Sequence, residues 1–254
     1  MRATADPAQV GLVSLAFLCV KSEAAECAAR NIFPILGADS LLVALQNGIT
    51  HHRLLTDILP VWALGITAQG ANLLGPGVVR HGGSGPTYLG FLADVDELAI
   101  HRLQEAIDLM NCADIATTFS SDILAVAWNK LIVNAGINAL TALENCTNGE
   151  LLSRPAATAT LKAAVLEAAT VGLACGISIA SDPVAMTVAV CRDTAENISS
   201  MLQDIRKRRH TEIEAINGAI VRQAAVLGIS VPTNQALVTG VKALEAKIKL
   251  TPLI

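Results

Sequence analysis

One lysine and two asparagines recur at four-residue intervals in the otherwise aliphatic stretch WNKLIVNAGINALTALENCTNGELL, residues 128–152. Lys130, Asn134 and Asn138 stand at positions i, i+4 and i+8, which places their side chains along one face of a helix. Ammonium and amide groups bind polar ligands, or they hydrogen-bond one another inside a core. Because the neighbouring residues are apolar, we expect this face to meet either a cleft or a buried polar network. The helix alone does not separate the two interpretations.

A second polar cluster is NISSMLQDIRKRRHTEIEAIN, residues 197–217. Ser199 or Ser200 could cap a long helix here. Glu212 follows Ser200 by twelve residues, which is about 18 Å along a continuous helix. The two side chains could therefore touch one small ligand only if the helix starts after Ser200 or breaks before Glu212. The alternatives are a capping role for Ser200 and a surface ion pair with nearby arginines for Glu212.

Two further polar sites follow apolar, β-like runs: Lys21 after LVSLAFLCV, and Gln46-Asn47-Gly48 after SLLVAL. Ligands of α/β proteins bind at the carboxyl ends of parallel strands, so these positions are candidates for ligand contact. The alternatives are a polar residue that merely ends an apolar strand, and an Asn-Gly turn.

The pattern of the chain changes near residue 120. Before it, short apolar runs alternate with helical periodicity, which predicts a βαβαβ unit with a parallel sheet, then a hairpin and a helix. After it only helical periodicity is present. The predicted strands are 12–21, 40–48 and 61–71, the hairpin is 75–92, and the helices are 22–36, 50–59, 95–112, 122–145, 155–175, 184–194, 199–227 and 233–249.

Composition limits the classes of function. The chain has 254 residues, of which 52% are hydrophobic and 16% charged, and its longest apolar runs fall short of the ~20 residues of a bilayer span. A net charge of −4 without an aromatic and basic stripe argues against a nucleic-acid partner. We expect a soluble, cytoplasmic protein with no membrane partner. Six cysteines without a CxxC pair argue against a zinc site or a disulfide framework, and we expect most of them to be buried.

Five stretches together carry a resemblance to a known family: VKSEAAE, QNGI, GPGVVRH, NKLIVNAGINALTALENCTNGEL and NISSMLQDIRKRRHTEIEAING. In these stretches, spread over essentially the whole chain, the sequence resembles ketopantoate reductase (2-dehydropantoate 2-reductase). The resemblance implies an α/β, Rossmann-like NADP-binding domain at residues 1–120 and an all-helical domain like that of 6-phosphogluconate dehydrogenase at 121–254. The implied activity is reduction of ketopantoate, a 2-keto acid, to pantoate by NADPH, on the route to pantothenate and coenzyme A.

Matching the motifs of that family residue by residue implies roles for the polar positions. The implied catalytic residues are Lys130 and Glu212, the implied substrate-binding residues are Asn134, Asn138, Asn197 and Ser200, and the implied cofactor-binding residues are Lys21 and Asn47. Hydride transfer to a ketone produces an alkoxide, and a lysine can both hydrogen-bond that oxygen and protonate it.

The sequence departs from the family at its beginning, because no strand followed by GxGxxG opens the chain. Its first strand matches a later strand of the family, so about fifty residues, somewhat more than one βαβ unit, are expected to be missing and the sheet to be partial. Two alternatives to the reductase therefore stay open: a non-catalytic remnant that acts as a homodimer or interaction module, and a reductase of another branched 2-keto acid. An exposed sheet edge predicts self-association.

Overall fold

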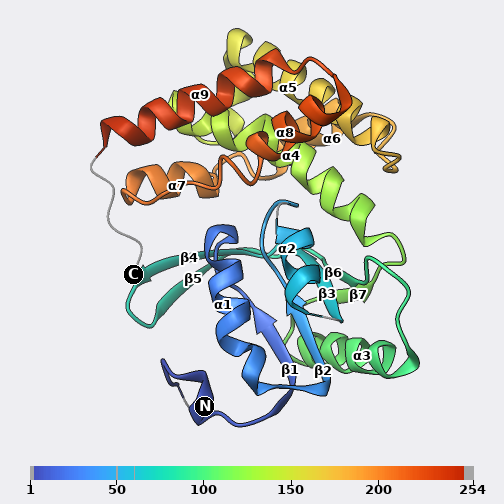
Figure 1. The fold of residues 1–254 in the computed structure, drawn as a ribbon. Helices are drawn as coiled ribbons and strands as arrows, with labels where there is room; N and C mark the ends of the chain where they lie inside the picture. Colours follow the sequence, from blue (N-terminus) through green and yellow to red (C-terminus); the bar gives the residue numbers. More distant parts are fainter. Residues whose placement is uncertain (1–2, 50, 60, 249–254) are drawn as a thin grey trace. The chain divides into compact units, whose positions relative to one another are not determined.

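The computed structural model describes residues 3–49, 51–59 and 61–248. The chain divides into two compact units, Met1–Val126 and Ala127–Ile254, and the division falls inside one long helix, α4 (Ile123–Glu144). The first unit combines strands and helices, whereas the second is helical in its described residues (Figure 1). This agrees with the fold class expected from the sequence.

The first unit is built on the predicted βαβαβ run. Strands β1 (Val13–Leu18), β2 (Leu36–Ala44) and β3 (Trp62–Thr67) are parallel neighbours, and helices α1 (Ala25–Ile32) and α2 (His51–Ile58) connect them. The predicted start of the second helix, Thr50, lies outside the described residues. Leu18 pairs with Ala44, so the carboxyl ends of β1 and β2 lie level at one edge of the sheet.

The predicted βαβαβ unit with parallel strands is confirmed, but the predicted hairpin at 75–92 was wrong, and beyond the first three strands the sheet is mixed. The hairpin begins earlier, with β4 (Gly70–Gly75) and β5 (Val78–Gly83), and forms a separate two-stranded sheet. Strand β6 (Thr87–Gly90) returns to the main sheet antiparallel to β3, and the short strand β7 (Thr117–Phe119) follows parallel to β6. The order β1-β2-β3-β6-β7 is therefore mixed. The glycines that suggested one long hairpin instead allow two reversals of the chain.

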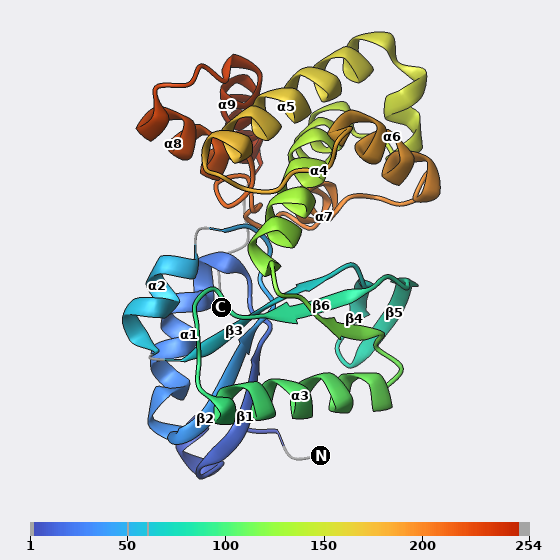
Figure 2. The ribbon, with the colours of Figure 1, turned by 90° about the vertical axis from the view of Figure 1, so that its right-hand side faces the viewer.

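Helices cover both faces of the main sheet (Figure 2). Helix α3 (Glu97–Cys112) buries Leu103, Ala106 and Ile107 against Leu41 and Val43 of β2. Side chains alternate along a strand, so the buried Leu42 and Ala44 point to the opposite face, where α1 and α2 lie. This core holds the strand ends in place.

The second unit contains α4, α5 (Pro155–Ala174), α6 (Pro183–Asp193), α7 (Ser200–Arg206), α8 (Asn217–Leu227) and α9 (Pro232–Lys247). Gly136 is a point of close packing of α4, because a Cβ there would lie 2.6 Å from Val165 of α5 and 3.3 Å from Thr187 of α6. The glycine thus lets α4 approach both helices. The predicted helices at 122–145, 155–175, 184–194 and 233–249 match within the described residues.

The predicted helix 199–227 is instead two helices with a non-helical segment between them. Helix α7 ends in a Schellman motif: the N–H of Arg209 donates to the carbonyl of Asp204, the N–H of Arg208 donates to that of Ile205, and Arg208 adopts φ 55°. Glycine is the usual residue at that left-handed position, so an arginine gave no stop signal in the sequence. The break places Glu212 outside both helices.

Helices α4 and α5 are long and apolar enough to cross a membrane by length and composition alone. Core helices of a globular domain pass the same test, and α4 is largely buried inside the protein. The absence of a membrane partner therefore stays a prediction.

The expectation that most cysteines are buried was wrong. Cys19, Cys27 and Cys112 are exposed, and only Cys146 and Cys191 are buried. All six are free thiols, and no cluster of three or more potential metal ligands is present among the described residues.

Candidate active site

Helix α4 presents Lys130, Asn134 and Asn138 on one face, as the four-residue spacing predicts. Asn138 is buried, while Lys130 and Asn134 are half-buried. Within the part of the chain that the structure describes, the side-chain amides of Asn134 and Asn138 make no hydrogen bond. Shielded amides without partners are suited to binding a polar ligand, because a satisfied internal network would occupy them. This favours the ligand-binding interpretation of the stripe.

Lys130 lies in an environment that weakens its basicity. Burial lowers its pKa from 10.5 to about 8, and the carboxylate of Glu212 opposes this by raising the pKa. The two residues are therefore close enough to interact, although they are far apart in the sequence. At neutral pH such a lysine is mostly protonated and still gives up its proton readily.

The segment that carries Glu212 is held on both sides. The N–H of Thr211 donates to Oε1 of Glu245 on α9 at 2.7 Å, and the N–H groups of Ala215 and Ile216 both donate to the carbonyl of Glu212 at 3.0 Å. Glu212 itself is buried, with 9% of its surface exposed. The alternative of a surface ion pair with the arginines is therefore not supported, and the break after α7 removes the 18 Å problem that a continuous helix would pose.

The sequence left open which of the two serines at the start of α7 caps the helix, and the structure shows that their roles differ. Ser199 is the N-cap: it is buried, and its Oγ accepts the N–H of Leu202 at 3.2 Å. Ser200 is the first residue of the helix and is exposed. Its hydroxyl is consequently not used for capping. Asn197, two residues before the cap, is also exposed.

Asn148 contacts the segment that precedes α7, although the sequence pattern did not indicate a role for it. Its backbone N–H donates to the carbonyl of Asn197 at 3.1 Å, and its Nδ2 donates to Oγ1 of Thr194 at 2.9 Å. Its buried Oδ1 has no donor among the described residues. The only sequence signal was Asn148-Gly149, which is also an ordinary turn signal. Asn148 thus holds the Asn197 segment and keeps one buried acceptor open.

Lys21 and Asn47 belong to the first unit and occupy equivalent places there. Each follows the end of its strand by three residues, and those ends, Leu18 and Ala44, pair in the sheet. Nε2 of Gln46 and the N–H of Leu45 both donate to the carbonyl of Leu18, at 2.7 and 3.0 Å. The carboxyl ends of β1 and β2 are thereby fastened together.

Gln46 carries a second feature of interest, because its buried Oε1 has no hydrogen-bond donor in the described chain. An unpaired buried acceptor is costly unless a ligand or water supplies a donor. The strand edge thus offers a cation (Lys21), an amide (Asn47) and an open acceptor, and this donor set fits a polar dinucleotide.

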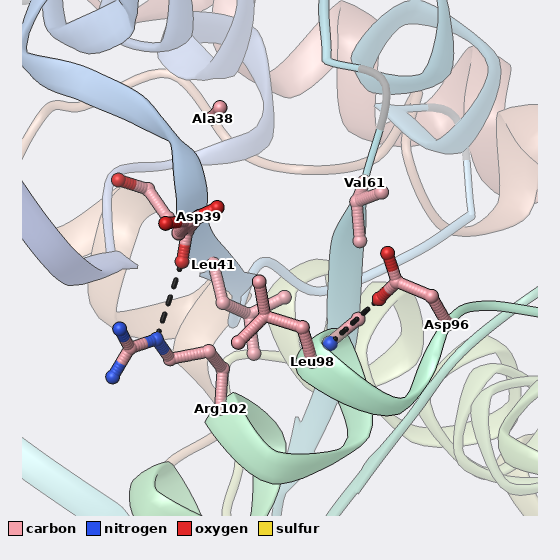
Figure 3. Close-up of a pocket in the computed structure, with 9 residues that line it drawn as sticks. Ala38, Asp39, Leu41, Val61, Asp96, Leu98 and Arg102 are labelled. Carbon is pink, nitrogen blue, oxygen red and sulfur yellow. Dashed lines mark hydrogen bonds between the residues drawn. The ribbon is translucent and has the colours of Figure 1, made fainter.

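Two hollows of the first unit lie away from these residues. The one in Figure 3 is lined by Asp39, Val61 and Arg102, among others, and its volume of about 30 Å³ is that of one water molecule. It lies near the amino ends of β2 and β3, the wrong end of the strands for a ligand site. A larger cavity of about 510 Å³ lies between α3 and the ends of β6 and β7, with Phe91 and Phe119 in its wall. Neither contains a predicted site residue.

Comparison with known families accounts for both units. Residues 2–94 match the family described as "Ketopantoate reductase PanE/ApbA", and residues 122–245 match "Ketopantoate reductase PanE/ApbA C terminal". The chain is 34% identical over 237 residues to a 2-dehydropantoate 2-reductase of Halobacterium salinarum, covering 91% of this chain and 76% of that protein. The chain belongs to the ketopantoate reductase family.

Other relatives agree with this family assignment. A 2-dehydropantoate 2-reductase of Yersinia pestis is 32% identical over 247 residues, which cover 96% of this chain and 78% of that protein. The crystal structure of a PanE/ApbA family ketopantoate reductase from Ralstonia eutropha superposes with a TM-score of 0.86 at 28% identity and covers 96% of this chain and 80% of that one.

A structure of D-mandelate dehydrogenase with NADH and anilino(oxo)acetate is also similar, with a TM-score of 0.85 at 28% identity over 93% of this chain and 77% of that one. The ketopantoate reductase fold is therefore shared with a dehydrogenase of different name. All eight predicted site residues lie inside the stretches that match the two family descriptions.

Proposed function

We propose that this chain is a 2-dehydropantoate 2-reductase that reduces ketopantoate to pantoate with a nicotinamide cofactor. The observation that carries the proposal is Lys130: a shielded lysine with a pKa of about 8, on a helix face that also carries two amides without hydrogen bonds to the described residues. The family membership supplies the substrate and the reaction. The alternative of a non-catalytic remnant is not favoured, because the chain retains Lys130, Asn134 and Glu212 together.

Lys130 is proposed as the group that handles the ketone oxygen. Its ammonium hydrogen-bonds the carbonyl and transfers a proton as negative charge develops on that oxygen. With a pKa of about 8, the side chain is about nine-tenths protonated at pH 7, so the acid is present in the form that the reduction requires.

Glu212 is proposed to keep Lys130 charged and to contact the substrate hydroxyl. Its carboxylate raises the lysine pKa, which counteracts part of the effect of burial. Asn134 and Asn138 are proposed to hydrogen-bond polar substrate atoms, since their amides have no partners within the described chain. Ser200 and Asn197, both exposed at the start of α7, are proposed to bind the carboxylate end of the keto acid.

Lys21 and Asn47 are proposed to hold the cofactor at the ends of β1 and β2. When bound, a reduced nicotinamide supplies the hydride. We propose NADPH as that cofactor, with NADH as the alternative to test. Lys21 offers a cation for phosphate groups, Asn47 an amide, and Gln46 an acceptor for N–H or O–H donors.

The test is cofactor binding followed by turnover. Calorimetry with NADPH and NADH, on the wild-type chain and on Lys130→Ala, measures binding separately from chemistry. Oxidation of NADPH that depends on ketopantoate then measures the reaction. We expect binding in both proteins and turnover that falls by about 10²–10⁴ in the variant. A folded wild-type chain that binds neither cofactor would contradict the proposal.

A panel of 2-keto acids tests the substrate, with the keto acid of mandelate included because a D-mandelate dehydrogenase shares the fold. A homodimer and a cytoplasmic location are parts of the same proposal. Light scattering of the purified chain tests the first, and cell fractionation the second.

A further inference from the structure

Thr141 continues the polar stripe of α4 beyond Asn138. It follows Lys130 by eleven residues, about three helical turns, and so lies on nearly the same face. Its side chain is fully buried, and its Oγ1 lies 2.6 Å from Oγ of Ser199, the N-cap of α7. The stripe therefore ends in a direct hydrogen bond to the residue that precedes Ser200.

The Thr141 hydroxyl also approaches two backbone carbonyls of its own helix. Oγ1 of Thr141 also lies 3.0 Å from the carbonyl oxygens of Ile137 and Asn138, and carbonyl oxygens only accept. Oγ1 of Thr141 thus lies within hydrogen-bonding distance of both carbonyls and of Ser199, and it donates to Oγ of Ser199 over the shortest of these distances, 2.6 Å. Oγ of Ser199 accepts in turn from the N–H of Leu202. Ser199 thus accepts one hydrogen bond from α4 and one from the first turn of α7, which links the two helices at this point.

The residues around this bond are the ones proposed to bind substrate. Asn138 contributes one of the carbonyls that Thr141 approaches, Ser200 follows Ser199 in the chain, and Asn197 precedes it by two residues. The Asn197 end of this segment is held separately by Asn148. The Thr141–Ser199 hydrogen bond thus ties the cap of α7 to the face of α4 that is proposed to bind substrate.

We propose that Thr141 and Ser199 are positioning residues, whose hydrogen bond fixes Ser200 and Asn197 relative to Asn138 and so sets the affinity for the keto acid. This inference rests on the proposed function. In this proposal neither hydroxyl contacts the substrate, because both residues are buried. A buried hydroxyl pair of this kind acts by holding exposed binding groups at the right separation.

The test compares Thr141→Val with Thr141→Ser, Ser199→Ala and the double variant. The matched control is Thr187→Val: Thr187 is also fully buried in a helix, but among the described residues its hydroxyl donates only to the carbonyl of Pro183 in its own helix. Loss of one buried hydrogen bond to a binding loop predicts a KM for ketopantoate raised by about 5- to 50-fold in Thr141→Val, with kcat changed by less than about 3-fold. The Kd for NADPH is expected to be unchanged.

Further outcomes separate positioning from general stability. Thr141→Ser keeps the hydroxyl and is expected to restore KM to within about 3-fold of wild type, and the double variant is expected to be no worse than the worse single variant. Thr187→Val is expected to lose stability without raising KM. A Thr141→Val protein with the KM of Thr187→Val overturns the inference. The inference is also overturned if Thr141→Val impairs KM, kcat and NADPH binding equally and Thr141→Ser restores none of them. A wild type that neither binds nor reduces any 2-keto acid overturns the proposed function, and this inference with it.

Discussion

Lys130 and Glu212 form an electrostatically coupled pair within the helical unit. Burial lowers the pKa of Lys130 to about 8, and the carboxylate of Glu212 keeps it from falling further. Neither the lysine on α4 nor the glutamate in the loop between α7 and α8 has this property alone. The pair gives a lysine that is charged at neutral pH and ready to release its proton.

The pH dependence of catalysis is expected to follow this coupling. If the protonated lysine is the acid, kcat/KM of the wild type falls as pH rises through about 8. In Glu212→Gln the opposing charge is gone, so the fall shifts to lower pH, in addition to any loss of maximal rate. A pH profile of kcat/KM measures the shift. Glu214→Gln, at an exposed ion pair with Arg222, serves as the control and keeps the wild-type midpoint. A midpoint that stays in place in Glu212→Gln would argue against the coupling.

Stability is expected to carry the same signature of Lys130. Its folded pKa of about 8 is below the unfolded value of 10.5, so between these values the unfolded chain binds more protons and stability rises with pH. The free energy of unfolding of the wild type, relative to that of Lys130→Met, is therefore expected to rise by up to about 3 kcal/mol as the pH increases over that range. Urea denaturation at several pH values measures it. Lys162→Met, at an exposed lysine, is the control. If the difference in unfolding free energy between wild type and Lys130→Met did not change with pH, the prediction would be contradicted.

Gly136 is expected to tolerate no Cβ. Alanine favours a helix by about 0.5–1 kcal/mol over glycine, but its Cβ would lie 2.6 Å from Val165, and such overpacking costs about 1–3 kcal/mol. We expect Gly136→Ala to lower the free energy of unfolding, and the added change Val165→Ala to recover part of it. Gly75→Ala meets only open space and serves as the control. A Gly136→Ala chain more stable than wild type would show that α4 does not pack this closely.

Glu167 is expected to stabilise the start of α9. Its carboxylate accepts the backbone N–H groups of Thr233 and Asn234 at 2.8 and 2.9 Å. Although burial raises its pKa, these hydrogen bonds outweigh burial and leave the pKa below 4.5. Its contribution is therefore present above pH 4.5 and lost as pH falls through the folded value. Glu167→Gln is expected to lower the free energy of unfolding by about 1–3 kcal/mol at pH 7. On acidification, the free energy of unfolding of this variant is expected to fall less than that of the wild type.

Denaturation of Glu167→Gln at pH 7 and in acid measures both effects. Glu26→Gln, which removes an exposed i,i+4 ion pair with Arg30, is the control and is expected to change stability by less than about 0.5 kcal/mol. Equal losses in the two variants would contradict a capping role for Glu167.

Several features of the chain could be predicted because they depend on local spacing. The four-residue interval of Lys130, Asn134 and Asn138 defines one helix face through helical geometry alone. The alternation of strands and helices before residue 112 predicted the βαβαβ unit, and the polar strand ends predicted Lys21 and Asn47 at one edge of the sheet.

Other features needed tertiary information. Helix α7 ends with Arg208 in a left-handed conformation that glycine usually adopts, so the helical periodicity of the sequence wrongly predicted one helix that continues through Glu212. The antiparallel return of β6 was hidden because a short run of glycines permits several chain paths. Asn148 and Thr141 gave no distinct signal, since their roles come from partners more than forty residues away.

By itself, the sequence determined the helix face, the alternation of the first three strands with helices and the family to which the motifs belong, because these follow from spacing and from residue type. Only the tertiary structure decided that Glu212 acts on Lys130, that Ser199 and not Ser200 caps α7, and that Thr141 binds Ser199. A pKa shift and a helix cap depend on burial and on partners that folding brings near, so the local sequence pattern does not predict either of them.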